Sequence, residues 1–151
     1  MALGAGQGSG HYPSMSSRMI SAMRYIDADA ALHFLTEVFG FAEHAVHRNG
    51  AGRVAHAELT FGGGMVMLGP DADTPFGRYM TMPSATGGRC TQTVYVIVDD
   101  PDAHHARAVA AGAEVVMPLR DESYGGREYS CRDPEGHVWT FGTYDPWTVK
   151  A

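Results

Sequence analysis

The sequence contains the same short pattern twice. Asp27 opens a helical pattern that ends at Gly40, thirteen residues later, and Asp99 opens a second pattern that ends at Gly112 with the same spacing. A β-rich run precedes each aspartate, and a later segment of each copy ends in Thr-Phe-Gly. Because a unit of this size cannot bury its apolar face alone, the repeat predicts two packed copies of a β-α-β-β-type unit, with a site between them.

Local signals mark the two expected helices. Asp27 offers a carboxylate to the free N–H groups of a helix start, and apolar residues recur at helical spacing from Ala31 onward. In the second copy, Asp99-Asp100-Pro101 combines capping carboxylates with a proline at the first helical position. A glycine closes each pattern, at the position after a helix where the backbone often adopts a left-handed conformation.

Length and composition fit a single globular domain. The chain has 151 residues, of which 44% are hydrophobic and 19% charged. We expect a flexible N-terminal tail at 1–18, one domain at 19–145, and a C-terminal tail at 146–151. Within the domain we expect module one at 19–69, a linker at 70–90 and module two at 91–145. The linker is rich in Pro and Gly, and its length also makes it a candidate lid.

Charge and cysteine content exclude several classes of partner. Basic residues number 11 against 17 acidic ones and are scattered, which argues against binding of a nucleic-acid backbone. No apolar run approaches the roughly 20 residues of a membrane span. Cys90 and Cys131 form no Cys-x-x-Cys pattern, so a disulfide framework is not indicated. We therefore expect a cytoplasmic protein without nucleic-acid or membrane partners.

Alternation along the strands separates an inner face from a face under the helices. In the run 54–61, His56 and Glu58 share the inner, concave side, while Leu59 lies under the helix. The same alternation turns Thr93 and Tyr95 inward.

In the last strand, Trp139 and Phe141 are expected under the second helix and Thr140 on the inner face. A turn at Pro134-Glu135 predicts that Tyr129 pairs with Thr140, and Cys131 with Val138, on that inner face. A few polar groups in an apolar concavity are typical of a small-molecule pocket.

Several motifs occur in order along residues 19–145, and some occur in duplicate. They are Arg24-Tyr25-Ile26-Asp27, Val38-Phe39-Gly40-Phe41, His56-Ala57-Glu58-Leu59, Val98-Asp99-Asp100 and Asp133-Pro134-Glu135-Gly136-His137. This series resembles the vicinal oxygen chelate superfamily, which includes glyoxalases, extradiol dioxygenases and bleomycin-resistance proteins. The resemblance implies an α+β fold, in which two tandem βαβββ modules form a curved eight-stranded open half-barrel with the helices outside. It also implies a homodimer.

The resemblance further implies four inner positions that hold a divalent ion in metal-using relatives. On this sequence they fall at Ile20 or Ser21, at Glu58, at Thr93 or Gln92, and at Thr140. Of these, Glu58 is the one ready ligand, and a divalent ion needs three or more oxygen or nitrogen donors. We therefore expect no metal cofactor. The alternative is one divalent ion held by His56, Glu58 and Gln92. His104 and His105 occupy helix positions that predict exposure to solvent.

Without a metal, the chain is most similar to the bleomycin-resistance members, which sequester a small molecule such as an antibiotic. An aromatic or cationic ligand is the expected partner. The expected ligand-binding residues are Arg24, His56, Glu58, Met67, Thr93, Tyr95, Tyr129 and Thr140. Arg24 stands where glyoxalase relatives bind an anionic substrate group, or it forms an ion pair with Glu58.

Two enzymatic alternatives remain open. One is a metal-dependent lyase or dioxygenase that acts on a substrate with vicinal oxygens through His56 and Glu58. The other is a cofactor-free enzyme in which Glu58 is the general base.

Overall fold

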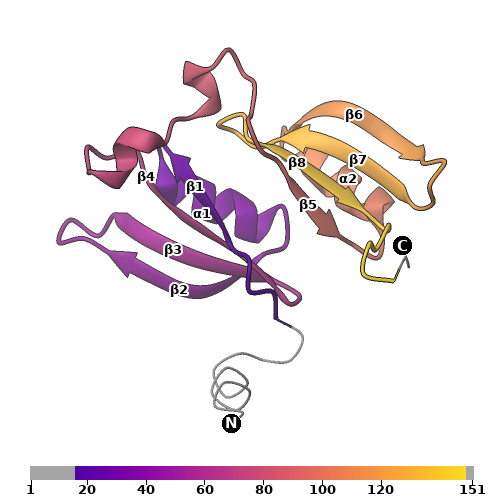
Figure 1. The fold of residues 1–151 in the computed structure, drawn as a ribbon, viewed down its shortest axis with the longest axis horizontal. Helices are drawn as coiled ribbons and strands as arrows, with labels where there is room; N and C mark the ends of the chain where they lie inside the picture. The colour runs from indigo at the N-terminus through magenta and orange to yellow at the C-terminus, as the bar shows by residue number, and fades with distance from the viewer. Residues whose placement is uncertain (1–15, 149–151) are drawn as a thin grey trace, which may run out of the picture.

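The computed structural model of the chain describes residues 16–148 and shows two consecutive βαβββ modules (Figure 1). Module one comprises β1 (Ser21–Tyr25), α1 (Ala28–Glu37), β2 (Ala42–Arg48), β3 (Val54–Phe61) and β4 (Gly64–Pro70). Module two comprises β5 (Val94–Ile97), α2 (Pro101–Ala110), β6 (Glu114–Asp121), β7 (Arg127–Arg132) and β8 (Val138–Gly142). The segment between them contains two short 3-10 helices, η1 (Phe76–Tyr79) and η2 (Pro83–Ala85). Of the predicted tails at 1–18 and 146–151, residues 1–15 and 149–151 lie outside the described residues.

Each module forms its own four-stranded sheet, ordered β1-β4-β3-β2 and β5-β8-β7-β6. In both sheets the first strand pairs in parallel with the fourth, and the remaining pairs are antiparallel. Figure 1 shows α1 behind the first sheet and α2 behind the second, so the opposite faces of both sheets stay open. The predicted α+β fold of tandem modules in an open, curved arrangement is confirmed. Within residues 16–148, no helix is long and apolar enough to cross a bilayer.

The helix boundaries follow from their capping residues. The side chain of Asp27 accepts the N–H of Ala30 at 3.0 Å and begins α1 as expected. In the second copy the capping residue is Asp100, which accepts the N–H of Ala103 at 3.0 Å. The prediction that Asp99 opens this helix was therefore wrong by one residue. Pro101 occupies the first turn, where its missing N–H is not needed.

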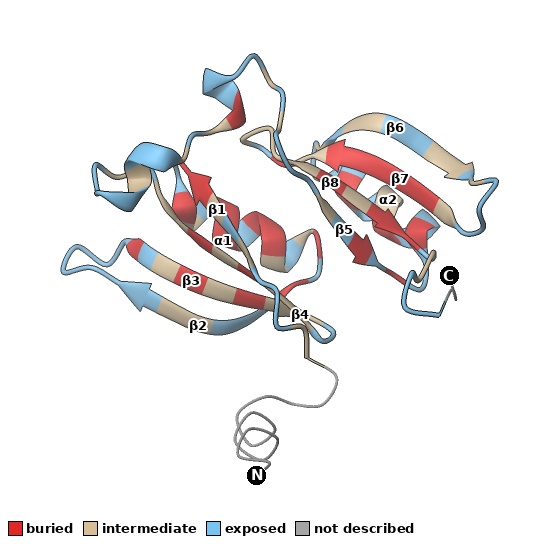
Figure 2. Ribbon diagram, in the orientation of Figure 1, coloured by how far each residue is buried: buried red, intermediate tan, exposed pale blue. Residues whose placement is uncertain are grey.

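The two modules share one hydrophobic core on the helix side of the sheets (Figure 2). Phe39, two residues after α1, packs its ring at 5.6 Å from Trp139 and 4.7 Å from Phe141. All three side chains are fully buried, as the alternation of the last strand predicted for its two aromatic residues. The core of module one is thus completed by aromatic side chains from module two.

The register of β7 and β8 differs by one residue from the sequence prediction. Thr140 pairs with Ser130, whereas Tyr129 pairs with Phe141 and Cys131 with Trp139. The hairpin closes between Asp133 and His137, so its loop has three residues and ends in Gly136 at a φ of +91°. A left-handed glycine in third place is typical of such loops. The predicted pairing of Tyr129 with Thr140 was wrong, and Tyr129 is fully buried beneath α2 instead of lying on the inner face.

Candidate ligand-binding site

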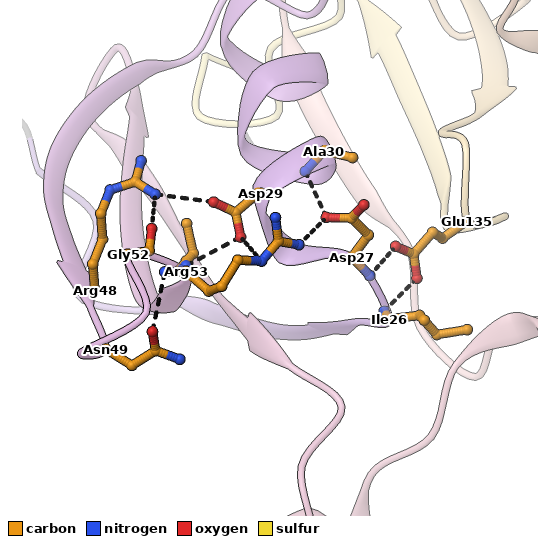
Figure 3. Close-up of polar contacts among 10 residues, drawn as sticks. Ile26, Asp27, Asp29, Ala30, Arg48, Asn49, Gly52, Arg53 and Glu135 are labelled. Carbon is orange, nitrogen blue, oxygen red and sulfur yellow. Dashed lines mark hydrogen bonds and ion pairs between the residues drawn. The ribbon is translucent and has the colours of Figure 1, made fainter.

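The loop between β7 and β8 ties module two to the first strand of module one. Asp133 accepts hydrogen bonds from the Tyr25 hydroxyl at 2.6 Å and from the Trp139 indole nitrogen at 3.1 Å. The Glu135 carboxylate accepts the backbone N–H groups of Ile26 and Asp27 at 2.6 and 2.8 Å (Figure 3). These contacts fix the end of β1, from which the side chains of the open face project.

An acid and an imidazole lie together on the open face of module one. On adjacent strands, Glu58 lies beside Met67, and Met67 lies beside Ala22. His56 Nε2 is 3.0 Å from Glu58 Oε2, and the His56 ring stacks on His47 with a centroid separation of 5.9 Å. Both members of the pair are partly exposed, so an incoming molecule can reach them.

A pocket of about 370 Å³ lies between this face and the segment that follows β4. The sheet lines it with Ala22, Arg24, Ala55, His56, Met67 and Gly69, and the segment lines it with Ala72, Thr74, Phe76, Gly77 and Met80. Three predicted site residues, Arg24, His56 and Met67, therefore line one cavity. Glu58 is hydrogen-bonded to one of them.

A second pocket, of about 350 Å³, adjoins the first across β1. The two share Ala22, Met23, Arg24 and Met80. Gln92 and Thr93 line this second pocket, together with Cys90, His137 and Val138. Gln92 and Thr93 thus line the second pocket, whereas His56 lines the first.

Arg24 does not pair with Glu58, so that alternative was wrong. Its guanidinium donates to the carbonyl oxygens of Ala72 and Gly77, and Nη2 lies 2.7 Å from the Asp71 carboxylate. The residue is 6% exposed, and its Nε is buried without a hydrogen-bond partner. Most of the donor capacity of Arg24 is therefore used by the segment that covers the pocket.

The open face of module two carries Tyr95 and Thr140, which line neither pocket, whereas the predicted Tyr129 is buried under α2. The hydroxyls of Ser130 and Thr140 are 2.6 Å apart, and the Tyr95 hydroxyl donates to the Tyr144 carbonyl at 2.8 Å. Burial, together with the nearby Glu128 carboxylate, raises the pKa of Tyr95 to about 12. Ser130, Tyr144 and buried Glu128 were not predicted for this face. The one-residue register error explains why Ser130 was missed.

His56 and Glu58 are the predicted metal-binding residues that the structure brings together. Across residues 16–148, no three His, Cys, Asp or Glu side chains are grouped so that they could hold a divalent metal ion. His56 and Glu58 are adjacent, but Gln92, the third member of the alternative ligand set, lines the other pocket. Two donors fall short of the three or more that such an ion needs.

Comparison with known proteins decides the family. The model of the Glyoxalase/Bleomycin resistance protein/Dioxygenase superfamily matches residues 20–141. The chain belongs to this superfamily. A superfamily relative in sequence is an uncharacterized protein of Mycobacterium bovis, which is 35% identical over 116 residues, or 77% of this chain and 76% of that protein.

Two solved structures are similar to this chain in fold. TioX from Micromonospora sp. ML1 is 38% identical, with a TM-score of 0.66 over 84% of this chain and 98% of that one. The bleomycin-binding protein from bleomycin-producing Streptomyces verticillus, solved with copper(II)-bleomycin, is 18% identical. It matches 84% of this chain and 95% of its own with a TM-score of 0.56, and this likeness concerns the fold alone.

Proposed function

We propose that this superfamily member binds and sequesters a small molecule in the pocket beneath residues 71–80, without a resident metal ion and without catalysing a reaction. The observation that carries the proposal is the pocket of about 370 Å³ lined by Arg24, His56 and Met67. A volume of this size is typical of ligand sites, as is a lining of apolar walls with a few polar groups. The bleomycin-binding relative provides a precedent for a small-molecule ligand on this fold.

The groups around the pocket favour an aromatic ligand that carries a positive charge. Glu58 uses one carboxylate oxygen for His56, and Asp71 neutralises the charge of Arg24. Thioether and aromatic side chains such as Met67 and Phe76 suit stacking on a planar molecule. The net charge of −6 also favours the approach of a cation.

The proposal includes a cytoplasmic homodimer. On the single chain, Tyr95, Ile97 and Met117 remain 36%, 38% and 45% exposed, and a second copy would cover such apolar side chains. Size-exclusion chromatography with light scattering measures the mass directly. A monomer at all concentrations would contradict this part of the proposal.

The second candidate is a metal-dependent lyase or dioxygenase built on His56 and Glu58, and the 3.0 Å contact between these side chains favours it. Elemental analysis of protein purified without chelator separates the two candidates. Near-stoichiometric zinc, nickel, manganese or iron that disappears in Glu58→Gln would overturn the metal-free proposal.

Ligand binding is tested with proflavine, a planar cationic dye, by fluorescence titration. We expect Glu58→Gln to weaken binding about tenfold, which corresponds to about 1.4 kcal/mol. Glu43→Gln, which changes an exposed glutamate on the neighbouring strand β2, serves as the matched control and should bind as the wild type does. Equal affinity in wild type and Glu58→Gln would remove Glu58 from the site.

A further inference from the structure

We propose that Arg24 is a positioning residue that holds residues 71–79, named here the roof segment, over the pocket. Because the guanidinium is used in this way, it also sets the charge preference of the site against anions. This inference rests on the proposed function, since it concerns the same pocket.

The guanidinium contacts of Arg24 lead to the roof segment. Its guanidinium donates to the carbonyl oxygens of Ala72 and Gly77 and pairs with the Asp71 carboxylate at 2.7 Å. The backbone of Arg24 is itself held, because His137 donates to its carbonyl oxygen at 2.8 Å. A side chain on a fixed strand thus binds both ends of the 72–77 turn.

The other hydrogen bonds of the 72–77 turn are local, whereas Asp71, at the start of the roof segment, donates its N–H to the Tyr25 carbonyl on β1 at 2.8 Å. Thr74 donates its N–H to the Ala72 carbonyl at 2.9 Å, and Gly77 donates its N–H to the Thr74 hydroxyl at 2.9 Å. They shape the turn without attaching it to the sheet. Beyond Asp71, the attachment of the 72–77 turn to the sheet therefore depends strongly on Arg24.

Gly77 is fitted to this contact. A Cβ at position 77 would lie 2.6 Å from the Ala72 carbonyl oxygen, 2.7 Å from Arg24 Nη1 and 2.8 Å from Thr74 Oγ1. Real Cβ atoms essentially never come that close to other heavy atoms. A side chain at this position would push the turn away from the guanidinium, so glycine and arginine form a matched pair.

The second module contains a contact between the corresponding elements. On β5, the first strand of module two, Tyr95 donates to the carbonyl of Tyr144, which follows the fourth strand, at 2.8 Å. Tyr144 packs on Tyr124 with a ring separation of 5.1 Å. In both copies a side chain of the first strand anchors the backbone after the fourth. This internal parallel supports an anchoring role for Arg24.

The anchoring role has a consequence for ligand charge. An anionic group that approaches the guanidinium competes with Asp71 and with the two carbonyl oxygens, so it must loosen the roof segment. A cationic group beside Glu58 leaves these contacts intact. The pocket should therefore close over a cation and open for an anion.

The test combines trypsin cleavage with stopped-flow dye binding. Arg78 lies in the roof segment with its side chain 74% exposed, so cleavage there reports how often the segment opens. We expect Arg24→Met and Gly77→Ala to be cleaved about tenfold faster, and to release proflavine about tenfold faster with a nearly unchanged association rate. Arg24→Lys should restore part of both effects. Arg48→Met, which removes a surface contact to Asp29 on the other side of the sheet, should match wild type.

Several outcomes would overturn the inference. One is wild-type cleavage and release rates in Arg24→Met and Gly77→Ala, measured after circular dichroism has shown both variants folded. Another is tighter binding of the anionic dye 1-anilinonaphthalene-8-sulfonate to wild type than to Arg24→Met, without faster cleavage, because Arg24 would then be an anion receptor. Should wild type bind neither dye, the proposed function fails, while the cleavage rates still decide whether Arg24 holds the roof segment.

Discussion

The ring of His104 in α2 donates from Nε2 to the carbonyl oxygen of Phe39 at 2.9 Å, across the boundary between the modules. Its Nδ1 lies 2.5 Å from the Tyr129 hydroxyl, which therefore donates to a neutral imidazole. Burial lowers the pKa of His104 and nearby Arg107 lowers it further, while the Phe39 carbonyl opposes the shift. The neutral ring thus hydrogen-bonds both modules and lies in their shared core.

The lowered pKa predicts an acid-sensitive stability. The unfolded chain takes up a proton at His104 near pH 6.5, whereas the folded chain does so at lower pH, so the free energy of unfolding falls as the pH drops below about 6.5. We expect His104→Gln to lose this part of the pH dependence. Urea unfolding at about pH 7.5 and about pH 5.5 measures this change in the free energy of unfolding. His44→Gln, on exposed β2, is the control, and parallel pH profiles for wild type and His104→Gln would contradict the prediction.

Removal of the Asp133 carboxylate should destabilise the fold strongly. Four donors would lose their acceptor, namely the Tyr25 hydroxyl, the Trp139 indole and the N–H groups of Glu135 and His137. Unsatisfied buried donors cost about 1–3 kcal/mol each, so we expect Asp133→Ala to lose about 3 kcal/mol or more in urea unfolding. Asp73→Ala, whose side chain is 90% exposed, should change stability by less than about 0.5 kcal/mol. Similar losses in both variants would refute the role given to Asp133.

A methyl group at position 142 should disrupt the open face of module two. A Cβ on Gly142 would lie 2.6 Å from the Glu128 Cβ and 2.8 Å from the Tyr95 hydroxyl. We expect Gly142→Ala to lose about 1–3 kcal/mol by overpacking, measured by thermal unfolding. Gly50→Ala has no heavy atom within 4 Å of the added methyl and provides the control. An unchanged melting temperature in Gly142→Ala would show that the face adapts.

The features that were predicted correctly from the sequence depend on residues that are close together in the chain. The N-terminal capping of α1 by Asp27 depends on neighbouring residues alone, as does the place of Pro101 in α2. Alternation identified the exposed and buried faces of β3 from His56 onward and of β8. The register of β7 and β8 was missed because it depends on whether the turn holds two or three residues, and the left-handed Gly136 adds the third.

The remaining errors concern partners that are distant in the chain. Arg24 binds the carbonyl of Gly77, 53 residues away, and no pattern around Arg24 indicates that contact. His104 was expected on the solvent side of its helix, yet it is 6% exposed because α2 packs against Phe39 of module one. Such contacts depend on how the two modules dock, which periodicity within one helix does not describe.

The bond between Trp139 and Asp133 gives the protein a built-in optical probe. Of the two tryptophans in the chain, Trp139 is fully buried and linked through Asp133 to Tyr25 at the end of β1, whereas Trp147 is 83% exposed. Iodide in solution should therefore quench the emission of Trp147 and leave that of Trp139. The unquenched emission of Trp139 then reports on the end of β1, beside the pocket, in protein that carries no added label.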